Sequence, residues 1–271
     1  MAAGSVNEAR SRWFVRLGPR GDERLRLFCF PYAGGDAVTI YRTWPRILHS
    51  SVGVYAVQLP GRSSRIAEPR YADIDSVLRD LRREFLAFVD KPFAFFGHSM
   101  GAVIGFELAR VLRSLLGREP ACLFVSGRRP PHSKCEKESS YDLPDVEFLS
   151  ELQRMNGTPK EVFENSELLQ LIIPLLRADF RLCQTYVFEP GEPLSCPLGA
   201  FGGLQDEVSS EVMDEWRIYT RGRFGLRMFS GDHFFIRSEQ DDVANEVANF
   251  LAQCEIADRS DRSNSKNVVT K

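Results

Sequence analysis

Residues 96–101 have the sequence Phe96-Gly97-His98-Ser99-Met100-Gly101. A short apolar run, residues 92–96, precedes this motif, and a helical pattern, residues 102–109, follows it. This order predicts a strand, a tight turn and a helix, with a serine between two glycines at the turn. Such a nucleophile elbow holds the serine in strained backbone geometry and exposes its hydroxyl above the edge of a sheet. The glycines are needed because a Cβ at either position would collide with the strand and the helix.

Apolar runs and helical patterns alternate on both sides of this elbow. The runs predict strands over residues 25–30, 52–57, 122–127, 197–203 and 225–229. Apolar residues at helical spacing predict helices over residues 41–48, 74–88, 212–219 and 242–252. Strands that alternate with helices indicate an α/β fold, with a mostly parallel sheet and helices on both faces.

The alternation breaks between about residues 128 and 193, where the pattern is mostly helical and is interrupted by Pro144, Pro159 and Pro174. Because strands resume afterwards, this block is an insertion between two strands of the sheet. We therefore expect a loosely structured lead-in over residues 1–24, one α/β domain over 25–256 with the insertion at about 128–193, and a disordered polar tail over 257–271. The insertion is either a cap that only stabilises the fold or a lid that lines an acyl pocket.

The composition excludes several classes of protein. The chain has 271 residues and a formal net charge of −2, so no basic excess suggests nucleic-acid binding. We find no signal peptide, and the longest apolar stretch, residues 168–176, is too short to span a membrane. The six cysteines form no Cys-x-x-Cys pair and there are four histidines, which argues against a zinc site or any other metal site. We expect a cytoplasmic protein with reduced cysteines.

Two partners for Ser99 follow later strands in the order that hydrolases with this elbow require. Asp206 comes just after the strand that ends at Gly203, and His233 comes just after the strand that ends near Gly231. One helix and one strand separate the two residues, so both side chains are expected at the same edge of the sheet. His233 is then the general base, Asp206 holds its imidazole in one tautomer, and Ser99 attacks an acyl carbon to form an acyl-enzyme.

Other residues are candidates for these roles. Glu207 or Asp232 is an alternative to Asp206 as the acid. His98 is adjacent to Ser99 and is expected to point away from it and to pack beneath the elbow. His49, at the end of an early helix, and His132, at the start of the insertion, are weaker candidates for the base.

An acyl-transfer site also needs backbone donors for the oxyanion. The N–H of Met100, directly after the nucleophile, is the first expected donor. The second is expected from the loop after residues 25–30, at Ala33, where Gly34 and Gly35 let the loop approach the substrate closely. We call residues 31–35 the oxyanion loop.

The motifs together identify a family. The chain resembles type II thioesterases, the stand-alone editing enzymes of polyketide and non-ribosomal peptide synthesis, and the related medium-chain thioesterase of animal fatty acid synthase. The resemblance covers about residues 27–250 and is carried by Phe30-Pro31-Tyr32-Ala33-Gly34-Gly35, Leu59-Pro60-Gly61-Arg62, the elbow, Leu176-Arg177-Ala178-Asp179, Gly202-Gly203-x-x-Asp206, Trp216 and Gly231-Asp232-His233-Phe234-Phe235.

This resemblance implies an α/β-hydrolase fold with a flexible helical lid. It also implies hydrolysis of acyl thioesters on the phosphopantetheine arm of acyl or peptidyl carrier proteins, which removes wrong or stalled acyl groups. The chain itself then needs no cofactor, its partner is a carrier protein, and we expect a monomer. Apolar residues of the insertion that either enclose the acyl chain or pack on the main domain include Leu168, Ile172, Leu176 and Phe180. A general carboxylesterase or lipase, or a non-catalytic binding protein, are the competing interpretations.

Overall fold

In this computed structural model, which describes residues 11–133, 139–157 and 160–266, seven strands of the described chain form one sheet. Its order is β1-β3-β2-β4-β5-β6-β7, and every neighbouring pair is parallel except β1 and β3. The predicted α/β fold with a mostly parallel sheet is confirmed. The strands are β1 (Phe14–Leu17), β2 (Leu25–Phe30), β3 (Val52–Val57), β4 (Phe93–His98), β5 (Cys122–Ser126), β6 (Leu198–Gly203) and β7 (Phe224–Phe229).

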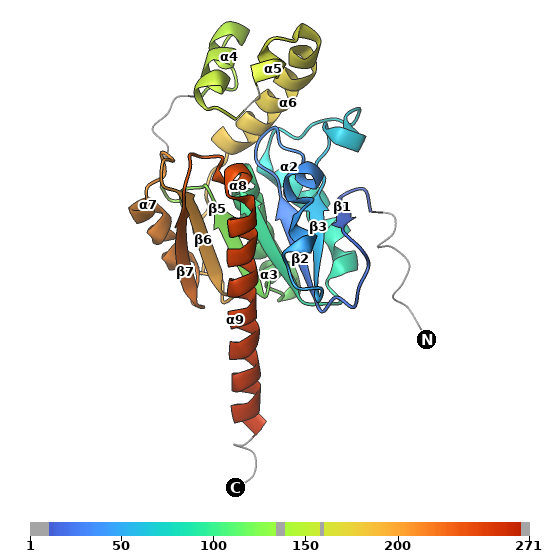
Figure 1. Ribbon diagram of the computed structural model, residues 1–271, viewed down its shortest axis with the longest axis vertical. Coiled ribbons are helices and arrows are strands. Elements are labelled where there is room, and N and C mark those ends of the chain that lie inside the picture. Colours follow the sequence, from blue (N-terminus) through green and yellow to red (C-terminus); the bar gives the residue numbers. More distant parts are fainter. Residues whose placement is uncertain (1–10, 134–138, 158–159, 267–271) are drawn as a thin grey trace.

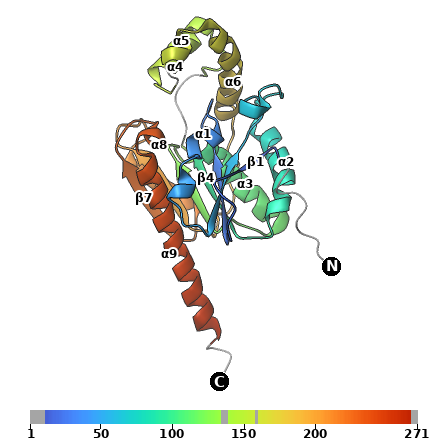
Figure 2. The same ribbon diagram turned by 45° about the vertical axis from the view of Figure 1, so that its right-hand side comes forward.

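Helices cover both faces of the sheet (Figures 1 and 2). Side chains alternate along β2, so Phe28 and Phe30 enter one apolar cluster and Leu27 and Cys29 enter another. The first cluster is closed by α2 (Ile74–Phe85) and α3 (Met100–Leu116), and the second by α1 (Ala37–Tyr41) and α9 (Gln240–Lys266). Burial on both sides explains why the central strands are continuous apolar runs.

Shorter elements complete the domain. Two short helices follow the last strands, α7 (Ser210–Asp214) after β6 and α8 (Phe235–Ser238) after β7. Single 3-10 turns cover Trp44–Arg46, Ser63–Arg65, Leu86–Phe88 and Glu215–Tyr219. Within the described residues, every helix is too short or too polar to cross a membrane.

Three helices of the insertion, α4 (Asp145–Arg154), α5 (Lys160–Phe163) and α6 (Ser166–Gln184), lie between β5 and β6 in the sequence. They stand beyond the end of the sheet where the parallel strands finish (Figures 1 and 2). A small apolar cluster of their own includes Phe148, Leu152 and Leu176. The later half of α6 enters the main body, where Leu175 and Leu182 are buried.

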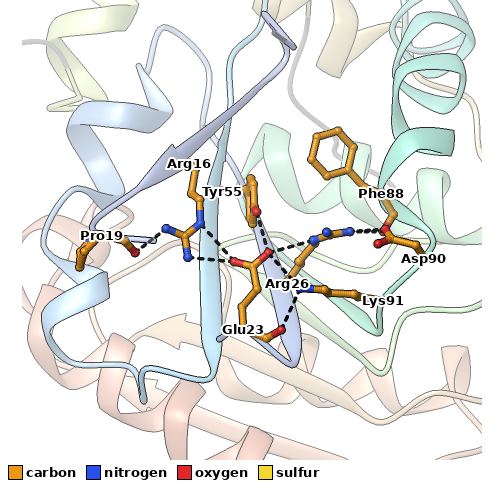
Figure 3. A network of polar contacts seen from close by, with 8 residues as sticks. All are labelled: Arg16, Pro19, Glu23, Arg26, Tyr55, Phe88, Asp90 and Lys91. Carbon is orange, nitrogen blue, oxygen red and sulfur yellow. Dashed lines mark hydrogen bonds and ion pairs between the residues drawn. The ribbon is translucent and has the colours of Figure 1, made fainter. Parts of the chain in front are cut away.

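A polar network lies at the other end of the sheet, around the start of β2 (Figure 3). The Glu23 carboxylate accepts from the hydroxyl of Tyr55 at 2.8 Å and from the guanidinium groups of Arg26 at 3.1 Å and Arg16 at 3.0 Å. Burial of Glu23 acts to raise its pKa, but the hydrogen bonds from Tyr55, Arg26 and Arg16 outweigh burial and the net pKa is lowered. This network links β1, β2 and β3 far from the elbow.

Three local predictions are wrong. Residues 14–17 of the expected lead-in form β1, because Phe14 and Leu17 bury their side chains beside β3. The helix expected over residues 41–48 is replaced by α1 and a 3-10 turn. Asp36 caps α1 by accepting from the N–H of Thr39, and Pro45 lacks the N–H that a continuing helix needs.

The third wrong prediction concerns the end of the chain. Helix α9 continues to Lys266, although residues 257–266 were expected to be disordered. Residues 240–266 contain no glycine or proline, so no helix breaker lies within α9. Residues 267–271, which belong to the same expected tail, and Cys135 lie outside the described residues.

Candidate active site

Ser99 lies at the junction between β4 and α3. Its backbone has φ 54° and ψ −111°, a region that residues with a side chain rarely adopt. Its N–H donates to the carbonyl of Ser126, at the end of β5, across 2.7 Å. A Cβ on Gly97 would lie 2.0 Å from the carbonyl oxygen of Gly101, and one on Gly101 would lie 2.4 Å from that of Phe30. The strained turn therefore needs both glycines.

Asp206 and His233 follow the neighbouring parallel strands β6 and β7 and are in contact. His233 Nδ1 lies 2.9 Å from Asp206 Oδ2, and the Asp206 side chain is 4% exposed. A carboxylate oxygen accepts this hydrogen bond, so Nδ1 is the donor. In the neutral ring Nε2 then has the lone pair that a general base needs. The loops meet because Gly203 has no side chain; a Cβ there would lie 2.5 Å from the carbonyl oxygen of Asp232.

Asp232, one of the alternative acids, has a different role in the structure. Its Oδ1 accepts from the N–H of Phe234 at 2.8 Å, and its Oδ2 lies 3.3 Å from the side-chain nitrogen of Asn156. The carboxylate thus closes the turn beside His233 and leaves Asp206 as the acid on the imidazole.

His98 is buried beneath the elbow, as the sequence predicts. Its Nε2 lies 2.8 Å from the backbone carbonyl oxygen of His233, and its Nδ1 lies 2.9 Å from Ser126 Oγ. Burial, together with the nearby His233, lowers the pKa of His98 well below its ordinary value, so the ring is neutral. Its bond to the backbone of His233 is a connection that the sequence did not predict.

The other two histidines lie elsewhere. His49 Nδ1 is 2.8 Å from Ser51 Oγ at an exposed turn, and His132 Nδ1 is 2.9 Å from the hydroxyl oxygen of Tyr219. In the described part of the chain, no hydrogen bond joins the Ser99 hydroxyl to His233. Catalytic hydrogen bonds are often long before substrate binds and tighten in the complex. The structure therefore joins Asp206 with His233 and connects His233 to the residue beside Ser99.

The two expected oxyanion donors follow neighbouring strands, β2 and β4. Met100 is the first residue of α3, where helix N–H groups have no partner within the helix. Ala33 lies in a turn closed by the N–H of Gly35, which donates to the carbonyl of Tyr32 at 2.9 Å. Gly34 has φ +76°, which favours glycine.

An ion pair that the sequence analysis did not assign lies next to this loop. Asp179, on α6, accepts from Arg62 Nη2 at 2.7 Å through Oδ1 and from the N–H of Gly34 at 2.7 Å through Oδ2. Arg62 Nη1 donates to the carbonyl of Gly35 at 3.1 Å. Both charged side chains are buried. Both residues belong to motifs that carry the family resemblance. Their presence there is the feature of the sequence that could have marked them as part of the site.

The expected lid residues have different environments. Leu176 is buried against the oxyanion loop, where a Cβ on Gly34 would lie 2.5 Å from its Cδ2. Ile172 and Phe180 pack partly buried against the small cluster of the insertion, and Leu168 is 40% exposed.

The turn after α4 contacts the other side of the site. Asn156 lies near Asp232, and the carbonyl of Gly157 accepts from Arg237 at 3.3 Å. A Cβ on Gly157 would lie 2.3 Å from the ring of Phe234, the neighbour of His233. The insertion thus contacts both the oxyanion loop and the residues around His233. Among the described residues, no group of three or more metal-ligating side chains is placed to hold a metal ion.

Comparisons with known proteins assign the chain to a family. The model of the thioesterase domain family matches residues 25–252. Linear gramicidin dehydrogenase LgrE of Brevibacillus parabrevis is 47% identical over 86% of this chain and 90% of its own length. The medium-chain S-acyl fatty acid synthase thioesterase of Rattus norvegicus is 33% identical over 86% of this chain and 89% of its own.

A solved structure matches closely as well. The type II thioesterase YbtT from the yersiniabactin NRPS/PKS biosynthetic pathway superposes with a TM-score of 0.79 and 29% identity, over 89% of this chain and 99% of its own. The fold of this chain is therefore the α/β-hydrolase fold. This chain belongs to the thioesterase family, and its likeness to the type II and medium-chain fatty acid synthase enzymes confirms the resemblance that its motifs predicted.

Proposed function

We propose that this protein is a serine thioesterase that hydrolyses acyl groups from the phosphopantetheine arm of acyl or peptidyl carrier proteins. Its role is to remove misprimed or stalled acyl groups in polyketide or non-ribosomal peptide biosynthesis. The observation that carries the proposal is the Asp206–His233 hydrogen bond at the edge of the sheet where the strained Ser99 stands. The family match supports the same chemistry.

Acylation of the enzyme is the first half of the reaction. Ser99 Oγ attacks the thioester carbonyl carbon while His233 Nε2 takes the hydroxyl proton, and Asp206 stabilises the positive imidazolium. The carbonyl electrons move to oxygen, where the N–H groups of Ala33 and Met100 stabilise the negative charge. When the intermediate collapses, the C–S bond breaks and the departing thiolate takes the proton from His233.

Hydrolysis of the acyl-enzyme completes the cycle. His233 takes a proton from water as the water oxygen attacks the acyl carbon, and the same two N–H groups stabilise the second oxyanion. The ester bond to Ser99 then breaks, Oγ recovers the proton from His233, and the free acid leaves. We propose that the protein acts as a cytoplasmic monomer with no cofactor or metal of its own. Light scattering tests the monomeric state, and a rate unaffected by a chelator tests the absence of a metal.

A carrier protein loaded with a defined acyl group tests the proposal. The purified chain should release free acid and carrier with a free phosphopantetheine thiol, both measured by mass spectrometry. The Ser99→Ala variant should abolish release, and a wild-type sample quenched during turnover should carry the acyl group on Ser99. Full activity of Ser99→Ala would exclude the mechanism.

The same assay tests one alternative, and the sequence bears on a second. An oxyester with the same acyl chain should react more slowly than the carrier thioester; the reverse order favours a general carboxylesterase or lipase. A dehydrogenase activity, suggested only by the name of LgrE, is not favoured because this sequence contains no Gly-x-Gly-x-x-Gly dinucleotide motif.

A further inference from the structure

The buried pair formed by Asp179 and Arg62 holds two adjacent residues of the oxyanion loop. The Asp179 carboxylate accepts from the N–H of Gly34, and the Arg62 guanidinium donates to the carbonyl of Gly35, while the two side chains also bind each other. Asp179 is 3% exposed and Arg62 5%. The loop backbone is therefore fixed by two charged groups that come from α6 and from the segment after β3.

The loop needs such support. It contains two consecutive glycines, one with φ +76°, and glycine has more backbone freedom to lose than any other residue. Its own turn contributes one backbone hydrogen bond, from Gly35 to Tyr32. The N–H of Ala33 lies directly before the anchored Gly34, so any shift of Gly34 moves this donor as well.

Helix α6 contributes an apolar contact beside the charged one. Leu176 and Asp179 are three residues apart, so they lie on the same face of the helix. Leu176 packs on Gly34 while Asp179 binds its N–H. Pro174 lies just before this segment and removes one helical hydrogen bond. Before Pro174, Leu168 and Leu171 are exposed, whereas after it Leu175 and Leu176 are buried. The part of α6 that docks on the loop thus begins at the proline.

We propose that Asp179, paired with Arg62, is a positioning residue that sets the oxyanion loop, so that docking of α6 on this loop is required for catalysis. The inference rests on the proposed function, because it assumes that Ala33 stabilises the oxyanion. A buried ion pair adds little net stability compared with a well-packed apolar pair. Here both partners also form hydrogen bonds with the backbone of the oxyanion loop. These bonds favour a role in holding the loop in position over a role in stability.

Two variants of Asp179 separate its contacts. Asp179→Ala removes both hydrogen bonds, whereas Asp179→Asn keeps an oxygen for Gly34 but loses the charge opposite Arg62. Arg62→Lys keeps the charge with a different donor geometry. Glu23→Gln is the matched control, because Glu23 is also a buried carboxylate paired with an arginine, at the other end of the sheet (Figure 3).

The assay compares substrate with a mimic of the tetrahedral intermediate. For each variant we would measure kcat and KM on an acyl N-acetylcysteamine thioester, and the inhibition constant of a boronic acid with the same alkyl chain, per titrated active site. For Asp179→Ala we expect kcat to fall about 10- to 100-fold, less than for outright loss of an oxyanion donor. KM should change by less than about threefold, and boronic acid binding should weaken as much as kcat/KM falls.

Each outcome decides the proposal. For Asp179→Asn and Arg62→Lys, kcat and boronic acid affinity should lie between those of wild type and Asp179→Ala. These two variants replace Asp179→Ala in the test if that variant does not fold. The control variant Glu23→Gln should be less stable than wild type, but its kcat, KM and boronic acid inhibition constant per active site should be unchanged. Wild-type kcat in the Asp179 variants, or a lowered kcat with unchanged boronic acid affinity, would overturn the inference.

A measurement without catalysis separates this inference from the proposed function. Hydrogen exchange of the Gly34 amide, followed by NMR, should be at least about tenfold faster in Asp179→Ala than in wild type, because the amide loses its buried acceptor. If the Gly34 amide exchanges at the same rate in Asp179→Ala and in wild type, Asp179 does not hold the oxyanion loop, even if the enzyme is active. If exchange is faster in the variant but no acyl group is ever trapped on Ser99 of the wild type, the proposed function is rejected. The role of Asp179 in holding the oxyanion loop is then still supported.

Discussion

The imidazole of His98 donates from Nε2 to the backbone carbonyl of His233 across 2.8 Å. A carbonyl oxygen only accepts, so Nε2 carries the proton and Nδ1 accepts from the hydroxyl of Ser126. The residue before the proposed nucleophile therefore holds the backbone of the proposed base. This bond ties the loop after β7 to the end of β4, and it explains how two loops far apart in the sequence keep their relative position.

Replacement of His98 by Gln should therefore change the dependence of stability on pH. Burial lowers the pKa of His98 well below 6.5, so below about pH 6.5 the unfolded chain binds a proton that the native protein does not bind. The wild-type free energy of unfolding should fall with decreasing pH by up to about 1.4 kcal/mol per pH unit more than that of His98→Gln. Urea unfolding of both proteins at pH 7.5 and 5.5 measures this, and parallel pH curves would contradict it.

Asp206→Asn should leave the fold intact and nearly abolish turnover. The amide still reaches His233 Nδ1 but offers its N–H₂ as a donor, which favours the wrong imidazole tautomer, and the expected loss in kcat is about 10⁴-fold. Glu207→Gln, at the adjacent position, is the control and should retain kcat within about twofold, as surface changes usually do. A larger loss for Glu207→Gln than for Asp206→Asn would mean that the acid is misassigned.

Gly97→Ala and Gly105→Ala should have opposite effects on stability. The new Cβ at position 97 would lie 2.0 Å from a backbone oxygen that cannot move aside, so we expect a loss of about 3 kcal/mol or more. At position 105, within α3, the new Cβ finds only ordinary contacts at 3.5 Å and beyond. Alanine there should add about 0.8 kcal/mol through helix propensity. Denaturant titration measures both, and equal destabilisation would contradict the elbow geometry.

Glu23→Gln should destabilise the protein without changing the chemistry. Breaking this buried pair costs about 3 kcal/mol, because Arg16 and Arg26 lose their carboxylate (Figure 3). The native pKa of Glu23 is lowered from 4.5, so its contribution is present above about pH 4.5 and is lost as pH falls through the native pKa. The stability gap between wild type and variant should therefore narrow in acid. A gap that is constant with pH would assign the loss to packing instead.

Much of the site could be predicted because strand order and motif order carry geometric information. The carboxyl ends of parallel strands lie at one end of the sheet, so Ser99 after β4, Asp206 after β6 and His233 after β7 were all expected there. The contact between Asp206 and His233 is present. The elbow was predictable from local sterics at Gly97 and Gly101. One error arose where a tertiary contact decided the structure, because β1 depends on burial of Phe14 beside β3. Another arose from local signals, because Asp36 caps an earlier helix start and Pro45 prevents the helix from continuing.

By itself, the sequence determined the alternation of strands and helices, the strained serine turn and the residue types of the proposed acid and base, because these follow from local sterics, periodicity and chain order. The tertiary structure alone decided which acid contacts His233, that His98 holds the backbone of His233, and that Asp179 reaches the oxyanion loop 145 residues away in the chain. These contacts join segments whose distance and orientation are set only when the insertion and the sheet pack together, and no local pattern encodes that packing.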